Sequence, residues 1–189
     1  MHTPHTRWAP YYTLHKLMNG FINIYTVAGN EKGLEMAENM GLWVYERLSR
    51  LDQNTLNMMW HKYIAGEYGG MNEVMATLAL LTEDEGNREK FLETAKLFDN
   101  TRFFFGTNYV SGLANNTDTI RGVHANQHIP QLTGALKIYD GTGERKYYDI
   151  ADNFWYMAKE SYSFSICGVG CNAANYETFH APPNTLLNG

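Results

Sequence analysis

Apolar residues recur at helical spacing in two stretches of the chain, residues 31–51 and 145–158. A helix turns once every 3.6 residues, so steps of three and four place apolar residues in one stripe. The first stretch carries such a stripe at Leu34, Ala37, Gly41, Val44, Leu48 and Leu51. The second carries one at Tyr147, Ile150, Ala151, Phe154 and Ala158, with Trp155 alongside. Both stretches are therefore predicted to be amphipathic helices.

A further helix is predicted to begin near Pro130, because proline lacks an N–H group and the first helical position does not need one. Its apolar stripe is expected at Ile129, Leu132, Leu136 and Tyr139. The turns "AGNE" at 28–31 and "DGTGE" at 140–144 supply glycine, which favours the end of a helix. These signals place helix boundaries on both sides of each turn.

The helical patterns repeat along the chain. Residues 20–48, 73–104 and 132–161 each contain an apolar helical stretch, a polar turn with glycine, a lysine and a second helical stretch. Aligning Lys32, Lys90 and Lys146 gives spacings of 90 − 32 = 58 and 146 − 90 = 56 residues. A period of this kind indicates an array of similar helical hairpins.

The predicted fold class is all-α, a partial toroid of antiparallel helical hairpins. Only "SYSFSIC" at 161–167 alternates like a strand, and it is short. The connections at 62–74 and 115–130 are rich in Gly, Asn, His and aromatic residues, and each leads into the first helix of a unit. Loops of that composition at equivalent ends of the hairpins would meet at one mouth of a toroid. An open solenoid is the alternative.

Composition narrows the class of protein. The 189 residues are 44% hydrophobic and 19% charged, which suits one globular domain or a large piece of one. The net charge of −5 and the lack of a basic run argue against a nucleic-acid partner. No apolar stretch approaches the roughly 20 residues that span a bilayer. The two cysteines, Cys167 and Cys171, do not make a disulfide framework, so free thiols are expected.

Glu177 is the candidate catalytic residue. It follows a glycine-rich stretch and stands between two aromatic residues in "NYETFH". A carboxylate in an apolar pocket can act as a general acid, whereas an exposed loop carboxylate cannot. Both interpretations stay open from the residues alone.

Four residues in the predicted mouth loops are candidates for binding a substrate: His15, Tyr68, Asn72 and His124. Each has a plainer alternative, since a histidine often only packs in the core and Asn72 or Glu73 could cap a helix. His124 and His128 lie four residues apart, a spacing that suits metal ligands on a helix. No third ligand is placed near them, so no metal site is predicted in this chain.

Longer motifs carry a resemblance. The segments "WAPYYTLHKLMNG" at 8–20, "EYGGMNEV" at 67–74 and "GVHANQHIPQLTGALKIYDGTGERKYYDIADNFW" at 122–155 resemble the bacterial β-L-arabinofuranosidases of glycoside hydrolase families 127 and 146. The resemblance implies an (α/α)6 barrel and a retaining mechanism. It also implies a cysteine nucleophile, a zinc ion held by glutamate and cysteines, and a glutamate acid/base.

Carried over by position, Glu177 matches the acid/base of these families, and His124 matches the histidine of their Gly-His-Ala segment. The Glu-x-Cys and Cys-Cys elements that hold zinc and supply the nucleophile would be expected beyond Gly189. Cys167 and Cys171 precede the acid/base and are not assigned to these roles. We therefore expect residues 1–189 to be one domain, an N-terminal part of the catalytic barrel. We expect it to hold no zinc and to be inactive alone, whereas full-length relatives would hold zinc.

Two other function classes stay open. One is another (α/α)6 sugar enzyme, such as an unsaturated glucuronyl hydrolase or a sugar epimerase, and the other is a non-catalytic carbohydrate-binding remnant. The expected partner is an oligosaccharide or arabinofuranoside, with self-association through the open edge of the toroid as a second interaction. The resemblance points to a bacterium, and the compartment, cytoplasm or periplasm, is not indicated.

Overall fold

A computed structural model describes residues 9–62, 66–107, 111–163, 168–169 and 178–179. The described part of the chain is helical, which confirms the predicted all-α class. Its helices are, in chain order, α1 (Pro10–Ala28), α2 (Glu31–Leu48), α3 (Gln53–Trp60), α4 (Met71–Leu81), α5 (Glu85–Leu97), α6 (Thr101–Phe104), the 3-10 turn η1 (Leu113–Asn115), α7 (Ala125–Thr142), α8 (Arg145–Met157) and the π-helical turn η2 (Ala158–Tyr162).

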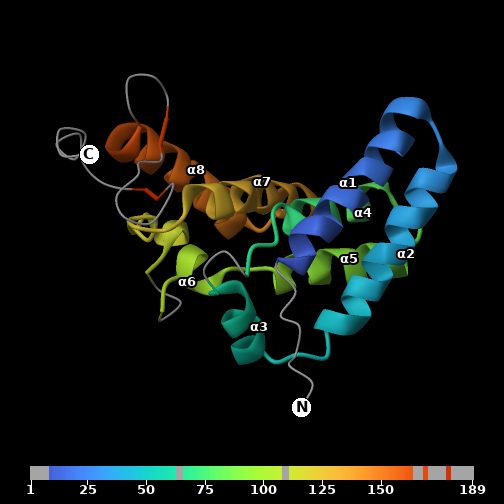
Figure 1. The fold of residues 1–189 in the computed structure, drawn as a ribbon, viewed down its shortest axis with the longest axis horizontal. Helices are drawn as coiled ribbons and strands as arrows, with labels where there is room; N and C mark the ends of the chain where they lie inside the picture. Colours follow the sequence, from blue (N-terminus) through green and yellow to red (C-terminus); the bar gives the residue numbers. More distant parts are fainter. Residues whose placement is uncertain (1–8, 63–65, 108–110, 164–167, 170–177, 180–189) are drawn as a thin grey trace, which may run out of the picture.

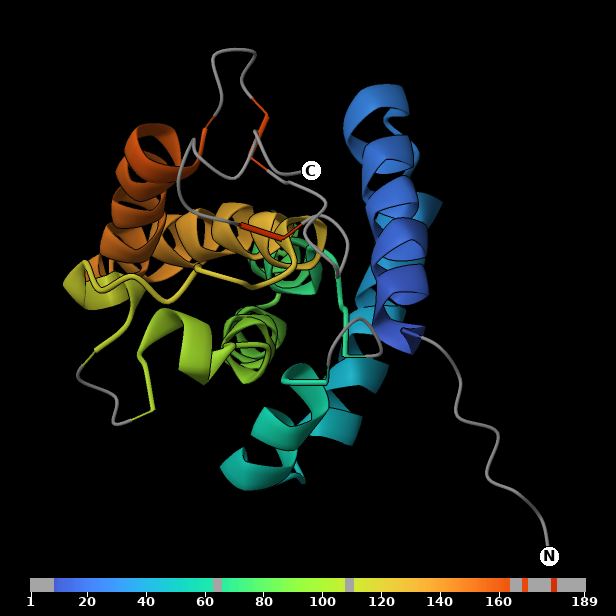
Figure 2. The ribbon, with the colours of Figure 1, turned by 60° about the vertical axis from the view of Figure 1, so that its left-hand side comes forward.

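Three hairpins, α1–α2, α4–α5 and α7–α8, follow one another across the molecule, as the repeat predicted (Figure 1). The first helix of the middle hairpin, α4, packs against the first helices of both neighbours, α1 and α7. The helices α2 and α5 also pack against each other. Figure 2 shows the α1–α2 pair standing to one side of α7 and α8. This arrangement is consistent with part of a helical toroid.

The helix ends follow from local side-chain chemistry. Asn30, Asp52 and Asp84 cap α2, α3 and α5 by accepting a hydrogen bond from a backbone N–H two or three residues later. Gly29 and Gly143 end α1 and α7 in the left-handed conformation, with φ of 66° and 70°. The predicted helix boundaries at "AGNE" and "DGTGE" are confirmed.

The apolar stripes predicted for α2 and α8 are largely confirmed. In α2 the residues Ala37, Gly41, Val44 and Leu48 are buried. In α8 the buried residues are Tyr147, Ile150 and Ala151, whereas Trp155 is 63% exposed. Periodicity therefore located the buried face of these two outer helices.

The prediction for α7 is wrong in two respects. The helix begins at Ala125, so Pro130 lies inside it, at its sixth residue, where its nitrogen cannot donate the usual helical hydrogen bond. The predicted stripe is also rotated, because Ile129 and Leu136 are exposed. The face turned to the core instead consists of Gln127, Gln131, Leu132, Gly134, Ala135 and Ile138, together with Ala125.

The strand-like interpretation of 161–167 is wrong for its first two residues, because Ser161 and Tyr162 belong to the π-helical turn η2. Residues 164–167 lie outside the described part of the chain. Within that part, the isolated antiparallel bridge between His124 and Thr178 is the only β-type pairing.

An aromatic cluster ties the first hairpin to the second. Tyr11 of α1 packs edge-on against Trp60 and Phe98, with ring centroids 5.4 and 5.5 Å apart. Tyr68 lies 5.2 Å from each of the same two rings. Such pairs add to the area that they bury. The cluster therefore fixes the connection after α3 against the start of α4. None of the described helices is both long enough and apolar enough to span a membrane.

Candidate functional site

The imidazole of His15 lies on the two glycines that precede α4. A Cβ atom added at Gly69 would lie 2.7 Å from His15 Nδ1, and one at Gly70 would lie 2.9 Å from His15 Nε2. Gly69 also has a φ of 58°, which disfavours other residues. The pair is therefore needed for the close approach of α1 to this turn. His15 is buried and its Nδ1 atom has no hydrogen-bond partner among the described residues.

Burial removes water from His15 and disfavours its charged form, and nearby Lys16 acts in the same direction. Together they lower the pKa of His15 to about 4. At neutral pH the imidazole is therefore uncharged and offers one donor and one acceptor, which suits a hydroxyl-rich ligand.

Glu73 lies beside His15 at the same turn. Its Oε2 atom is 3.0 Å from the position of a Gly70 Cβ atom, so it is at most 2.9 + 3.0 = 5.9 Å from His15 Nε2. The same oxygen accepts a hydrogen bond of 3.0 Å from the Thr133 hydroxyl of α7. Polar groups from α1, α4 and α7 therefore meet where α4 begins. We name His15, Glu73 and Thr133 the mouth cluster.

Tyr68 and Asn72, two predicted substrate-binding residues, are completely buried. Asn72 Nδ2 donates a hydrogen bond of 2.8 Å to the Gln131 carbonyl of α7, so it joins two helices. Tyr68 belongs to the aromatic cluster, and its hydroxyl has no partner among the described residues. Their positions explain both residues by packing, and the prediction that they touch a substrate is not tested.

His124 is the N-cap residue of α7, and its backbone pairs with Thr178 in an antiparallel bridge. Gly122 N–H donates to the Phe179 carbonyl at 2.7 Å, and Phe179 N–H donates to the Val123 carbonyl at 3.0 Å. Glu177 itself lies outside the described residues. Its neighbour in the sequence, Thr178, is nevertheless held beside His124, 54 residues away in the sequence (178 − 124).

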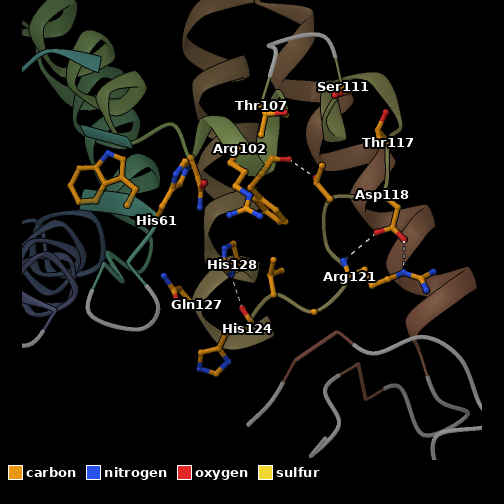
Figure 3. A pocket seen from close by; sticks show the side chains of 17 residues that line it. His61, Arg102, Thr107, Ser111, Thr117, Asp118, Arg121, His124, Gln127 and His128 are labelled. Atoms are coloured by element: carbon orange, nitrogen blue, oxygen red, sulfur yellow. Dashed lines mark hydrogen bonds and ion pairs between the residues drawn. The ribbon is translucent and has the colours of Figure 1, made fainter. Parts of the chain in front are cut away.

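A cavity of about 530 Å³ lies between the end of α3, the α6 segment and the start of α7 (Figure 3). We name it the α3–α7 cavity. Its lining includes the basic or titratable side chains His61, Arg102, Asp118, Arg121, His124 and His128. Its apolar lining includes Trp60 and Phe103, and Gln127 and Asn100 contribute amide groups. Figure 3 shows Arg102 near the middle of this group, with His61 on one side and Asp118 and Arg121 on the other.

Asp118 and Arg121 neutralise each other at one edge of this cavity. Arg121 Nε lies 3.5 Å from Asp118 Oδ2, and the Tyr162 hydroxyl donates to the same oxygen at 2.5 Å. Burial and the Asp118 charge raise the pKa of Tyr162 to about 12, so it stays protonated and keeps donating.

His128 lies deeper in the α3–α7 cavity. Its Nδ1 atom is 2.8 Å from the His124 carbonyl oxygen, and its ring packs against Phe103 at 4.7 Å. Burial lowers the pKa of His128 to about 4, so the ring is neutral at pH 7. With the Nδ1 proton donated to the His124 carbonyl, Nε2 is left as an acceptor.

The described residues do not fit a zinc site. No three His, Cys, Asp or Glu side chains among them lie close enough together to hold a metal. The four-residue spacing of His124 and His128 joins them through the His124 carbonyl and the His128 ring instead. Cys167 and Cys171 lie outside the described part of the chain.

The sequence patterns did not identify Glu73, Thr133, His61 or Arg102 as site residues. Glu73 was interpreted as a capping residue, and no side chain caps α4. The useful signal was its position three residues after the Gly pair, on a helix whose first turn faces two other helices. No local signal marks Arg102, because its neighbours in space come from distant segments.

Comparison with known proteins gives one match. The family model for the β-L-arabinofuranosidase GH127 catalytic domain matches residues 1–187. No curated protein matches the chain.

Proposed function

This chain belongs to the β-L-arabinofuranosidase GH127 catalytic-domain family, and we propose that it carries the acid/base side of a retaining glycosidase site for plant-derived arabinofuranosides. A glycoside hydrolase-like function follows from the family. The observation that supports the finer assignment is the pairing of Gly122–His124 with Thr178–Phe179. It holds the sequence neighbour of Glu177 against the start of α7, close to the other predicted sugar-binding histidine.

Glu177 is proposed as the general acid/base. Cleavage of a glycosidic bond needs a carboxylic acid that protonates the leaving oxygen, and in a retaining enzyme the same group later removes a proton from the attacking water. The residue before Thr178 suits this role, because Thr178 and Phe179 are buried and the flanking chain excludes water. An apolar setting of this kind favours the protonated form of a carboxyl group at neutral pH.

His15 and His124 are proposed to bind sugar hydroxyl groups. His15 is neutral at pH 7, so it can donate and accept without attracting a counter-ion. Glu73, held by Thr133, is the nearest carboxylate in the described structure that could orient a hydroxyl toward His15. The proposal assigns these residues to binding and positioning, not to bond cleavage.

Zinc and the cysteine nucleophile are not assigned to any described residue, and no step is routed through them. We accordingly propose that residues 1–189 form one incomplete barrel domain that does not complete the two displacements alone. Exposed apolar residues on α1 and α7 support the proposed self-association. They include Leu17 and Ile24 on α1, and Ile129 and Leu136 on α7. Each pair is seven residues apart and so shares one face of its helix.

Binding of methyl β-L-arabinofuranoside, followed by two-dimensional NMR, tests the proposal. We expect chemical-shift changes at the start of α4 and α7, and at least a tenfold weaker affinity in the His15→Ala and His124→Ala variants. His61→Ala is the matched control, because it removes an imidazole outside the proposed arabinose site. Absence of binding, or equal binding by all three variants, would contradict the assignment.

A turnover assay separates the acid/base assignment from binding. With p-nitrophenyl β-L-arabinofuranoside, we expect no hydrolysis by this chain. If hydrolysis is seen, and survives in Glu177→Gln, Glu177 is not the acid/base.

A further inference from the structure

We propose that the α3–α7 cavity binds the carboxylate of an acidic sugar, with Arg102 as the anchoring cation. The anion site is inferred from the geometry of the cavity alone and goes beyond the proposed hydrolysis. That its ligand is a sugar rests on the proposed function.

Arg102 is the first observation. It is exposed and lines the cavity, and it makes no hydrogen bond or ion pair with another described residue. The second arginine of the lining, Arg121, is already paired with Asp118. The lining therefore carries two guanidinium groups against one carboxylate, although the chain as a whole has a net charge of −5. A concave site with an unmatched arginine suits a planar anion, because guanidinium binds carboxylate through two parallel hydrogen bonds.

His61 is the second observation. Its side chain stands close enough to Arg102 for the two positive charges to disfavour each other, and this contributes to the lowered pKa of His61 after the larger effect of burial. The other groups that act on it are Asn100, a hydrogen-bond partner, and His128, which is neutral. No carboxylate among them offsets the two bases. An anion between His61 and Arg102 would supply that missing charge.

The rest of the lining favours a sugar over a simple anion. Phe103 and Trp60 provide an apolar wall, which suits the C–H face of a pyranose ring. His128 offers an acceptor at Nε2, and Asn100 and Gln127 bring amide groups to the same lining. A volume of about 530 Å³ falls in the range of small-ligand sites. A hexuronate combines these three requirements in one molecule.

Titration calorimetry with D-galacturonate and its neutral counterpart D-galactose tests the inference. We expect galacturonate to bind at least tenfold more tightly than galactose, and sodium chloride to weaken the binding. Arg102→Gln should abolish the difference between the two sugars. Arg50→Gln is the control of equal charge, since Arg50 is also exposed but lies outside the cavity. It should leave the difference unchanged.

Acetate and inorganic phosphate serve as further probes. The sugar part of the inference is overturned if either anion binds as tightly as galacturonate. The anion part is overturned if galactose and galacturonate bind equally, or if Arg102→Gln keeps the preference. NMR adds a readout that a merely structural role would not change, because the pKa of His61 should rise when galacturonate is bound.

The measurements are independent of the proposed hydrolysis. His15→Ala should weaken arabinofuranoside binding without changing galacturonate binding, and Arg102→Gln should do the reverse. Failure of one proposal therefore leaves the other readable.

Discussion

The side-chain amide of Asn72 occupies the space in which any residue other than glycine at position 134 would carry its Cβ atom. That atom would lie 2.0 Å from Asn72 Cγ and 2.1 Å from Asn72 Oδ1. The same amide donates to the carbonyl of Gln131, one turn earlier in α7. Helices α4 and α7 thus approach each other through a polar side chain that fits only against glycine. This contact sets how the second and third hairpins are placed around the mouth cluster.

The Gly134→Ala substitution should destabilise the protein by about 3 kcal/mol or more, because the clash is with a fully buried and hydrogen-bonded side chain. Urea denaturation followed by circular dichroism measures this change. The control is Gly20→Ala, a glycine inside α1 with no atom within 4 Å of an added Cβ atom. That variant should be neutral or slightly stabilising, because alanine favours the helix.

A double-mutant cycle tests whether the clash is with Asn72 itself. Asn72→Ala removes the amide, so Gly134→Ala should be much less destabilising in that background. Additive effects in the cycle would mean that a different contact makes Gly134 necessary.

The same contact shows where prediction from the sequence failed. Periodicity located the buried faces of α2 and α8, because apolar residues fill them and hydrophobicity reports burial there. In α7 the buried face contains Gln127, Gln131 and Gly134, whose polar groups are satisfied by another helix. A hydrophobic pattern cannot reveal burial that depends on a hydrogen-bond partner 59 residues away.

The candidate site was predictable only in part. The motifs led to His15 and His124, and the structure places each at a turn that precedes or begins one of the first helices of the hairpins. The α3–α7 cavity was not predictable, because Arg102 and His61 come from separate connections with no shared pattern. Loops that are brought together by packing leave no periodic trace in the sequence.

Asp99→Asn should stabilise the protein at alkaline pH. Burial raises the pKa of Asp99 to about 7, although the Tyr147 hydroxyl donates to it at 2.8 Å. A carboxyl group with a raised pKa contributes its full stability below about pH 4, and this is lost as the pH rises toward 7. Asparagine stays neutral, so at pH 8 the variant should be more stable by on the order of 2 kcal/mol, with little difference near pH 4.

Denaturation at pH 4, 6 and 8 gives the profile for Asp99. Asp140→Asn is the control, because this exposed residue pairs only with Lys137 on the same helix and should show no such pH dependence. A constant difference between Asp99→Asn and the wild type across pH would show that the carboxyl group is not desolvated.

His15 should make the folded state sensitive to acid. Its pKa is lowered to about 4 in the folded protein, against about 6.5 in an unfolded chain. The unfolded state therefore binds more protons between these values, and stability falls as the pH drops from 6.5 toward 4, by at most about 3 kcal/mol from this group. His15→Gln does not titrate, so the difference in unfolding free energy between variant and wild type should change with pH in that window. A flat difference would place His15 in contact with solvent.

The last prediction concerns the segment that follows the proposed acid/base. Phe179 is fully buried between Phe154 and Tyr162, with ring centroids 5.8 and 5.9 Å away. Its backbone N–H and carbonyl both bond to the chain before α7. Replacing it with alanine removes the ring that holds this pairing in place, so we expect a loss of about 3–5 kcal/mol where the pairing is part of the cooperative fold. If the pairing opens separately, overall stability changes little, and hydrogen exchange at Gly122 and Phe179 distinguishes the cases. In the wild type both amides should exchange slowly, and in Phe179→Leu, which keeps an apolar side chain, they should remain protected. Rapid exchange of both amides in the wild type would remove the contact that places residue 178 beside His124, and with it the structural support for Glu177 as the acid.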